Sequence, residues 1–376
     1  MATRQTLQTE RDQRYMRECL DLARAMLGLT TPNPAVGCVI VRGGEVVGCG
    51  ATASGGRPHG ETQALAMAGP RARGATAYVS FEPCAHYGQT PPCARALADA
   101  GVARVVAGCR DPYPAVRGRG LAMLRRAGIA VTVGVLEQEC RRLNEGFITR
   151  VTLGRPLVIL KLAMSLDGRI AAASGDSRWI SSAQSRELVH RWRREADAVM
   201  VGAGTVIADN PRLTCRIEGG RDPVRVIIDG HLRCPPDATV FRQRSNAPAI
   251  LVTTARNAAR AQRRYAGQRV EVLGAAARDN AVLLEPLMRE FGQRGWARVL
   301  IEGGAHLGAA ALAAGIVDRV AFFIAPRIIG SGLPAIEGLG AGKVSEAIEA
   351  RDLVARPIGA DWLMEADVPH QSGRRS

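Results

Sequence analysis

A histidine, a glutamate and two cysteines near the start of the chain form a pattern that suits a catalytic metal. His59 lies two residues before Glu61, and Cys84 and Cys93 each follow a proline. An imidazole and two thiolates suit Zn²⁺, and three protein ligands leave the fourth tetrahedral position to a water molecule. Zinc lowers the pKa of such a water to about 7, and a carboxylate that is not a ligand can then carry its proton. The pattern predicts a hydrolytic zinc site with Glu61 as general acid and base.

Two other interpretations of these residues stay open. His86 lies close to Cys84 and could complete a closed four-ligand zinc site, which would be structural and would give Glu61 no role. Alternatively, the cysteines are unrelated core residues, because the chain contains nine of them and cysteine packs readily in apolar strands. The joint occurrence of the histidine–glutamate and proline–cysteine pairs argues against this last interpretation.

Glycines in the second half of the chain favour binding of a phosphate-bearing cofactor. Gly303 and Gly304 follow a strand-like run over 297–301 and precede a helical run over 306–314. Backbone N–H groups at such a helix start can approach a phosphate closely. The segment 202–207 matches a Rossmann fingerprint only weakly, since its third glycine is missing and no acidic residue follows a second strand at the right distance. A Rossmann fold is therefore rejected.

The elements that must position these residues alternate between strands and helices, which indicates an α/β fold. The pattern restarts near residue 150, so we expect two domains, 1–150 and 151–376. In the first domain we expect helices over 13–28, 61–68, 93–100 and 119–127, and strands over 36–41, 45–49, 75–81, 102–109 and 129–135, with a hairpin turn at Gly43–Gly44. In the second we expect strands over 157–163, 198–201, 224–229, 248–253, 269–273, 297–301 and 317–324, and helices over 181–196, 280–293 and 306–314, the first capped by Ser181 or Ser182.

Composition narrows the class of protein. The formal net charge is +15, but it comes from 48 Arg and 2 Lys spread along the whole chain, and aromatic residues make up only 4%. Stacking platforms for bases are therefore scarce, which argues against nucleic acid and leaves attraction of phosphate-bearing small molecules. No apolar run is long enough to cross a bilayer, and the cysteines show no disulfide spacing. We expect a cytoplasmic protein without membrane contact.

The motifs resemble those of the bifunctional deaminase–reductase family of riboflavin biosynthesis. In the first half they are the segments 32–37 (PNPAVG), 58–61 (PHGE) and 82–93, where eight residues separate the cysteines instead of the two typical of nucleic-acid deaminases. In the second half they are 161–170 (KLAMSLDGRI), 175–180 (GDSRWI), 202–214 (GAGTVIADNPRLT) and 302–307 (EGGAHL).

The resemblance implies a fold, two reactions and two cofactors. It implies a cytidine-deaminase-like three-layer α/β/α domain followed by a dihydrofolate-reductase-like α/β domain, in a homo-oligomer. The first domain would use zinc to deaminate 2,5-diamino-6-ribosylamino-4(3H)-pyrimidinone 5′-phosphate. The second would use NADPH to reduce the ribosyl group to ribityl, giving 5-amino-6-ribitylaminouracil 5′-phosphate.

The resemblance also implies which residues bind the ligands. For the cofactor they are Ala163, Trp179, Thr205, Asp209, Gly304, Ala305, His306, Leu307, Gly308, Ala309 and Ala310. For the substrates they are Asn33, His86 and Asp111 in the first domain and Lys161, Ser177, Leu213, Arg216 and Glu302 in the second. Lys161, Asp209 and Glu302 are candidates for assisting hydride transfer to the ribose C1′.

Five positions depart from the family pattern. Gly60 replaces an alanine, Thr52 stands where many relatives have histidine, Gln89 replaces a basic residue, Tyr113 replaces an asparagine and Gly230 replaces a serine. These positions concern substrate and cofactor placement rather than the metal. Three alternatives to the bifunctional enzyme follow: a nucleoside or nucleic-acid deaminase with an accessory domain, a non-catalytic zinc-binding protein, or a relative that makes another pyrimidine product.

Overall fold

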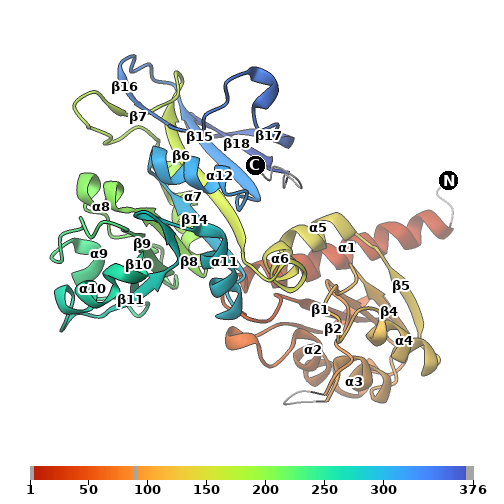
Figure 1. Cartoon of the computed structure of the whole chain (residues 1–376). Helices are drawn as coiled ribbons and strands as arrows, with labels where there is room; N and C mark the ends of the chain where they lie inside the picture. Colours follow the sequence, from red (N-terminus) through yellow and green to blue (C-terminus); the bar gives the residue numbers. More distant parts are fainter. Residues whose placement is uncertain (1–3, 88–90, 370–376) are drawn as a thin grey trace. The chain divides into compact units, whose positions relative to one another are not determined.

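The chain divides after Gly154 into two units, each with its own hydrophobic core (Figure 1). The computed structural model describes residues 4–87 and 91–369. The boundary expected at 150–151 falls inside the last helix of the first unit, α6 (Glu145–Leu153). Gly154 ends that helix with a positive φ of 70°, a conformation that glycine adopts without strain.

The first unit is built on a five-stranded mixed sheet. β1 pairs antiparallel with β2 and with β3, whereas β3, β4 and β5 run parallel. Gly43 and Gly44 both have positive φ in the turn between β1 and β2, which confirms the predicted hairpin. In spatial order the strands are β2 (Glu45–Ala51), β1 (Gly37–Arg42), β3 (Thr76–Val79), β4 (Arg104–Ala107) and β5 (Ala130–Val133).

Helices cover both faces of this sheet, as the three-layer prediction requires (Figure 1). One face carries α1 (Arg4–Ala25), α5 (Glu137–Leu143) and α6; the other carries α2 (Gly60–Ala68), α3 (Cys93–Asp99) and α4 (Arg119–Arg126), with short 3₁₀ turns at Ser54–Gly56 and Gly69–Ala72. The strand register shows which residues face which helices. Cys38 of β1 pairs directly with Gly50 of β2, so these two residues share one face of the sheet. Gly37 precedes Cys38 along β1 and therefore faces the opposite side.

Glycines bring the helices unusually close to the sheet. A Cβ on Gly37 would lie 1.9 Å from the carbonyl oxygen of Cys19 in α1, and a Cβ on Gly48 would lie 2.2 Å from that of Ala64 in α2. These distances are well below van der Waals contact, so no other residue fits without moving the helix. The start of α2, which carries Glu61, is thereby seated directly on β1 and β2.

The second unit contains a nine-stranded sheet in which seven neighbouring strands are parallel, and a terminal hairpin joins its edge through an antiparallel strand. This mixed sheet agrees with the predicted reductase-type α/β domain. In spatial order the strands are β11 (Val270–Ala275), β10 (Ala249–Thr254), β9 (Val224–Ile228), β8 (Ala198–Gly202), β14 (Arg298–Glu302), β6 (Leu157–Ser165), β15 (Arg319–Ala325), β18 (Asp361–Asp367) and β17 (Arg351–Ile358).

Two hydrophobic clusters cover the two faces of this sheet. The face that carries Leu300 and Phe323 is covered by α7 (Ala183–Glu195), α8 (Ala203–Asp209), α9 (Thr239–Arg242) and α10 (Ala258–Arg264), and the other face by α11 (Leu284–Gln293) and α12 (Ala305–Ala313). The side-chain alternation of a strand places Lys161 and Glu302, which are directly paired between β6 and β14, on the α7 face. The remaining elements are the pairs β7 (Arg169–Ala172) with β16 (Gly332–Pro334) and β12 (Ala277–Arg278) with β13 (Ala281–Val282), and 3₁₀ turns at Ala255–Asn257 and Val344–Glu346.

Several elements differ from the sequence-based expectation. Helix α1 begins at Arg4 rather than residue 13. Residues 6–11 are exposed and lack the apolar spacing on which the prediction relied, and the Gln8 amide donates to Asp12 four residues on. The helix expected over 280–293 is wrong at its start, where the chain first forms β13. The hairpin of β17 and β18 and the helices α5 and α6 were not predicted at all. Ser182 caps α7 by accepting from the backbone N–H of Ser185, as expected.

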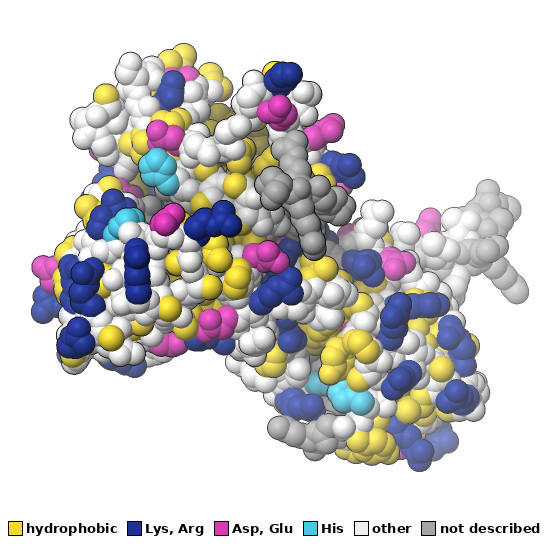
Figure 2. All heavy atoms as spheres, viewed as in Figure 1, with side chains coloured by type: hydrophobic (Ala, Val, Ile, Leu, Met, Phe, Trp, Pro, Cys, Tyr) yellow, Lys and Arg dark blue, Asp and Glu magenta, His cyan; other side chains and the backbone are white. Residues whose placement is uncertain are grey.

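Charged side chains of both signs are spread over the face of the molecule drawn in Figure 2. Figure 2 shows Lys and Arg side chains spread over this view of both units, with Asp and Glu side chains among them. None of the helices in the described part of the chain has the length and apolar character needed to span a lipid bilayer.

The close packing of α2 against the sheet at Gly48 allows a prediction about stability. Gly48→Ala should lower the free energy of unfolding of the first unit by about 1–3 kcal/mol, because the new methyl group overpacks against the Ala64 carbonyl. Gly43→Asn is the matched control in the same hairpin, since nothing lies within 4 Å of its Cβ position and asparagine tolerates its φ of 61°. Urea unfolding measures both. A Gly48→Ala variant as stable as the control would show that α2 can shift freely.

Candidate active sites

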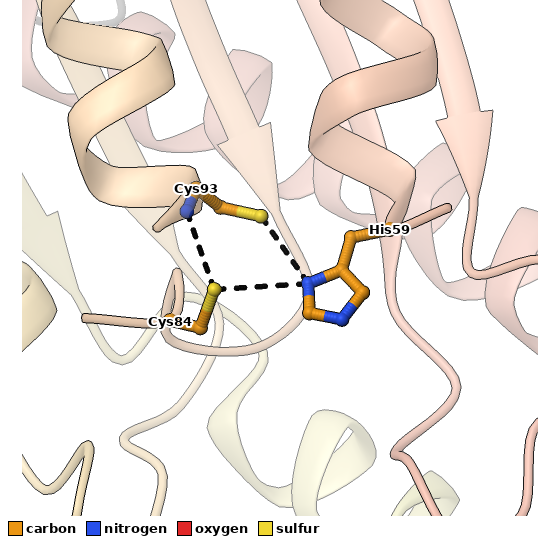
Figure 3. Close-up of side chains that lie close together, drawn as sticks. All are labelled: His59, Cys84 and Cys93. Carbon is orange, nitrogen blue, oxygen red and sulfur yellow. Dashed lines mark hydrogen bonds between the residues drawn. The ribbon is translucent and has the colours of Figure 1, made fainter. Parts of the chain in front are cut away.

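Three possible zinc ligands converge at one end of the first unit (Figure 3). His59 directly precedes α2, Cys93 is the first residue of α3, and Cys84 lies on the loop after β3. Their ligand atoms all lie within 4.8 Å of one another. The Nδ1 atom of His59 is 3.3 Å from the Cys93 sulfur and 3.7 Å from the Cys84 sulfur. One imidazole nitrogen and two sulfurs at this spacing are a donor set that fits zinc.

Burial and mutual hydrogen bonds shift the pKa values of these groups. A hydrogen bond from the Cys93 thiol, assisted by His59, lowers the pKa of Cys84 to about 4, and the same hydrogen bond raises that of Cys93. The hydrogen bond to Cys84 raises the pKa of His59. Cys84 also accepts from the backbone N–H of Cys93 at the start of α3, at 3.2 Å. A thiolate is therefore favoured at Cys84, which is the ionisation state that binds a metal.

A buried glutamate holds the loop that carries Cys84. Glu82 is only 4% exposed, and its carboxylate accepts hydrogen bonds from one backbone N–H group on the loop after β4 and from others at and just before the start of α4. A Cβ on Gly120 would lie 1.9 Å from the carbonyl oxygen of Pro83, so α4 also packs directly on this loop. The donors and distances are Asp111 (3.2 Å), Gly118 (3.0 Å), Gly120 (3.1 Å) and Leu121 (3.4 Å).

A cavity of about 270 Å³ opens beside the three ligands. Its walls bring together all the residues implied for the deaminase site apart from Cys93, namely Asn33, His59, Glu61, Cys84, His86 and Asp111. Burial raises the pKa of Glu61 to about 7, and the neighbouring Cys84 adds to that rise. Burial likewise raises the pKa of Asp111 to about 7, although its carboxylate accepts the Tyr113 N–H. His86 is absent from the ligand cluster found among the described residues, which disfavours a closed four-ligand site.

A second and larger cavity, of about 1410 Å³, lies in the second unit. It is lined by every residue implied for the reductase site except Gly308 and Ala309, that is by Ala163, Trp179, Thr205, Asp209, Gly304, Ala305, His306, Leu307, Ala310, Lys161, Ser177, Leu213, Arg216 and Glu302. A Cβ on Gly308 would lie 3.4 Å from Leu160 of the core, and Ala309 is buried. These two residues of α12 therefore lie away from the cavity.

An ion pair buried beside this cavity organises its charged side chains. Arg193 of α7 binds Glu302 through two hydrogen bonds, Nε to Oε1 at 2.6 Å and Nη2 to Oε2 at 2.7 Å. Burial alone would raise the pKa of Glu302, but Arg193 and Lys161 hold it below its usual value. Burial lowers the pKa of Lys161, whose Nζ lies 5.7 Å from the centre of the Phe323 ring.

The loop before α7 places an exposed tryptophan at the same cavity. Trp179 is 61% exposed, and the guanidinium of Arg186 stacks over its ring at 4.5 Å from the centroid. Such a contact holds an indole in place at the surface. Ser177 donates to a carboxylate oxygen of Asp209 at 3.3 Å.

Comparisons with known proteins assign both units. The family model described as the zinc-binding region of cytidine and deoxycytidylate deaminases matches residues 9–109, and that of the RibD C-terminal domain matches residues 156–364. The riboflavin biosynthesis protein RibD of Aquifex aeolicus (strain VF5) is 41% identical over 356 residues, which are 94% of this chain and 98% of that protein. The protein of the same name from Synechocystis sp. is 44% identical over 358 residues, covering 94% and 95%.

This chain belongs to the RibD family of riboflavin biosynthesis proteins. It is a deaminase and a reductase in one chain, and a deaminase with an unrelated accessory domain is not favoured. Among solved structures, the deaminase/reductase of Thermotoga maritima has a TM-score of 0.85 at 37% identity, covering 96% of this chain and 100% of that one. Acinetobacter baumannii RibD has a TM-score of 0.85 at 36% identity, covering 96% and 99%.

Some departures from the RibD family pattern have a local structural reason. A Cβ on Gly60 would lie 2.7 Å from the Val36 carbonyl oxygen, and one on Gly230 would lie 1.9 Å from that of Asn280. The hydroxyl of Thr52 is buried and bonds the backbone N–H of Val36 at 3.1 Å. Gln89 lies outside the described residues.

Two site residues were missed by sequence reasoning. Arg193 is the partner of Glu302, and His190 lies one turn earlier on the same side of α7, where Arg216 contacts it at 3.0 Å. Burial, with Arg193 and Arg216 nearby, lowers the pKa of His190 to about 4. The sequence did contain a signal for both residues. His190 and Arg193 are basic and three positions apart, which places them on the same side of a helix, next to the buried Val189.

The ligand geometry predicts the metal content. The purified protein should carry about one zinc ion per chain, and Cys84→Ser or Cys93→Ser should lose most of it, since each removes one of three protein ligands. Cys49→Ser is the control, because Cys49 lies outside the ligand cluster and contacts Met67. Elemental analysis after dialysis against a chelator measures the zinc bound per chain in each protein. Equal zinc in all four proteins would exclude this site.

The Arg193–Glu302 pair predicts a non-additive effect on stability. Arg193→Leu should destabilise the second unit by about 3–5 kcal/mol, because it leaves the Glu302 carboxylate buried without its partner. The double variant Arg193→Leu with Glu302→Leu should recover most of that loss. Urea unfolding of these two variants and of Glu302→Leu alone, with Arg191→Leu as an exposed control on the same helix, measures the coupling. Additive losses would mean that the pair is not coupled.

Proposed function

We propose that the first unit removes the 2-amino group of 2,5-diamino-6-ribosylamino-4(3H)-pyrimidinone 5′-phosphate. The observation that carries this proposal is the convergence of His59, Cys84 and Cys93 within 4.8 Å beside a cavity lined by the buried Glu61. A zinc ion held by these three residues would supply an acidified water with a pKa near ~7. The Thermotoga maritima protein, which covers nearly the whole chain, is named for this deamination and for the following reduction.

Glu61 is the group that moves protons in this unit. It is 3% exposed and lines the cavity together with His59 and Cys84. We propose that Glu61 takes a proton from the attacking water and delivers it to the leaving amino nitrogen, so that ammonia departs and a carbonyl oxygen replaces it. Asn33, His86 and Asp111 line the same cavity and would orient the pyrimidine ring.

The second unit, we propose, reduces the ribosyl group of the deaminated product with NADPH. Its cavity fits such a cofactor in size, and Gly303 and Gly304 leave the N-terminus of α12 open to a phosphate. Arginines that line the cavity suit the phosphates of cofactor and substrate; they are Arg178, Arg186, Arg193, Arg212, Arg216 and Arg233. NADPH would supply a hydride to the ribose C1′ of the open-chain imine.

Lys161 is the best placed of the three candidates to assist this step. Glu302 is held as a carboxylate by Arg193, so it is not set up to give a proton, and Asp209 is hydrogen-bonded to Ser177. Lys161 lies on the adjacent strand and lines the cavity. We propose that its ammonium donates a proton to the imine nitrogen as hydride reaches C1′.

Compartment and assembly complete the proposal. All nine cysteines are free, which suits a reducing compartment and supports a cytoplasmic location.

The edge strand β17 is exposed along almost its whole length, with Leu353 and Val354 more than half exposed. An uncovered apolar edge of a sheet supports assembly into a homo-oligomer.

The two activities should separate by mutation. Glu61→Gln should slow ammonia release by about 100-fold or more, because it removes the proton carrier, while NADPH oxidation with the deaminated substrate stays unchanged. Lys161→Gln should give the opposite result. Ammonia release and absorbance at the NADPH band are followed separately for each protein. Parallel loss of both activities in either variant would contradict independent sites.

A further inference from the structure

Two cationic side chains that the hydrolytic chemistry does not use line the deaminase cavity. Among the described residues that line it there are two arginines, Arg57 and Arg150, and no lysine. Both side chains are half-buried. The carboxylate of Glu82, which also lines the cavity, is engaged by backbone N–H groups and so does not offset them.

Two hydrogen bonds connect Arg150, through residues 32 and 33, to the loop that ends next to Arg57. Arg150 of α6 donates from Nη2 to the carbonyl oxygen of Pro32 at 2.7 Å, and its guanidinium lies 5.6 Å from the centre of the Phe147 ring. The next residue, Asn33, donates from its side chain to the carbonyl oxygen of Gly56 at 2.8 Å. Arg57 follows directly. Both arginines line the same cavity of about 270 Å³.

The hydroxyl of Thr52, which also lines the cavity, bonds the backbone of Val36. The cavity wall thus offers two forked cationic donors for a dianion, and guanidinium groups match phosphate oxygens in geometry and charge.

We infer that Arg57 and Arg150 bind the 5′-phosphate of the deaminase substrate. This inference rests on the proposed function and names the residues that select a phosphorylated substrate over the free ribosylaminopyrimidine. A phosphate held by the two arginines would anchor one end of the substrate in the cavity that the zinc ligands also border.

The test compares substrates with and without the phosphate. For the phosphorylated substrate, Arg57→Gln and Arg150→Gln should each lower kcat/KM of ammonia release by about 10-fold to 100-fold, mainly through KM. For the same ribosylaminopyrimidine without its phosphate, both variants should stay within about twofold of the unmutated protein. Arg57→Lys should recover part of the loss, because it keeps the charge.

Controls separate binding from folding. Arg125→Gln, on the exposed side of α4 and outside the cavity, should leave both substrates unaffected. Zinc content should be equal in all variants. Equal losses for the two substrates, or no loss for either, would overturn the inference while ammonia release by the unmutated protein still supports the proposed function. Absence of ammonia release from the phosphorylated substrate by the unmutated protein would instead overturn the proposed function itself.

Discussion

The zinc-ligand geometry depends on the hydrogen bonds that the Glu82 carboxylate accepts from the backbone around the start of α4. A buried carboxylate without such donors would cost several kcal/mol, so the loop after β3 has one well-determined position. Cys84 lies two residues along that loop, and its sulfur therefore meets the helix starts that carry His59 and Cys93. Glycine at 48, 50 and 60 lets α2 approach the sheet closely enough to complete the cluster. The chemistry follows from backbone packing more than from any single side chain.

The two units place their candidate sites at similar positions in the sheet but stabilise the buried charged groups there differently. Each places its candidate site at the carboxyl ends of parallel strands, where loops and helix starts meet, the first after β3 and β4 and the second after β8, β9 and β14. In the first unit, the Cys84 thiol, the His59 imidazole and the buried Glu61 carboxyl lie close together beside a small cavity. His59 helps to lower the pKa of Cys84, and Cys84 helps to raise that of Glu61. In the second unit, Arg193 binds Glu302, and Lys161 lies on the adjacent strand beside the larger cavity. Buried charge is tolerated in both because each group has a partner.

Short-range patterns predicted most of what positions the sites, and long-range partners could not be predicted. Three signals are local: the spacing of His59, Glu61 and the cysteines, the glycine turn before β2, and the Ser182 cap. In the structure these residues lie where the predicted chemistry and elements need them. The partner of Glu302 lies 109 residues earlier, and the role of Glu82 requires knowing that α4 begins beside it. The strand β17 was missed because it is exposed and lacks the alternation of apolar residues that marks a half-buried strand. The face of α12 that turns Gly308 inward likewise depends on packing against Leu160.

The central claim is that one imidazole and two thiolates hold a zinc ion with an open position beside Glu61. X-ray absorption at the zinc edge of the purified full-length protein tests it most directly. The account predicts two sulfur neighbours at about 2.3 Å and two nitrogen or oxygen neighbours at about 2.0–2.1 Å, one of them from water. In Glu61→Gln this first shell of neighbours should persist, because Glu61 is not a ligand. A spectrum with no sulfur neighbours, or with four protein ligands and no water, would contradict the account.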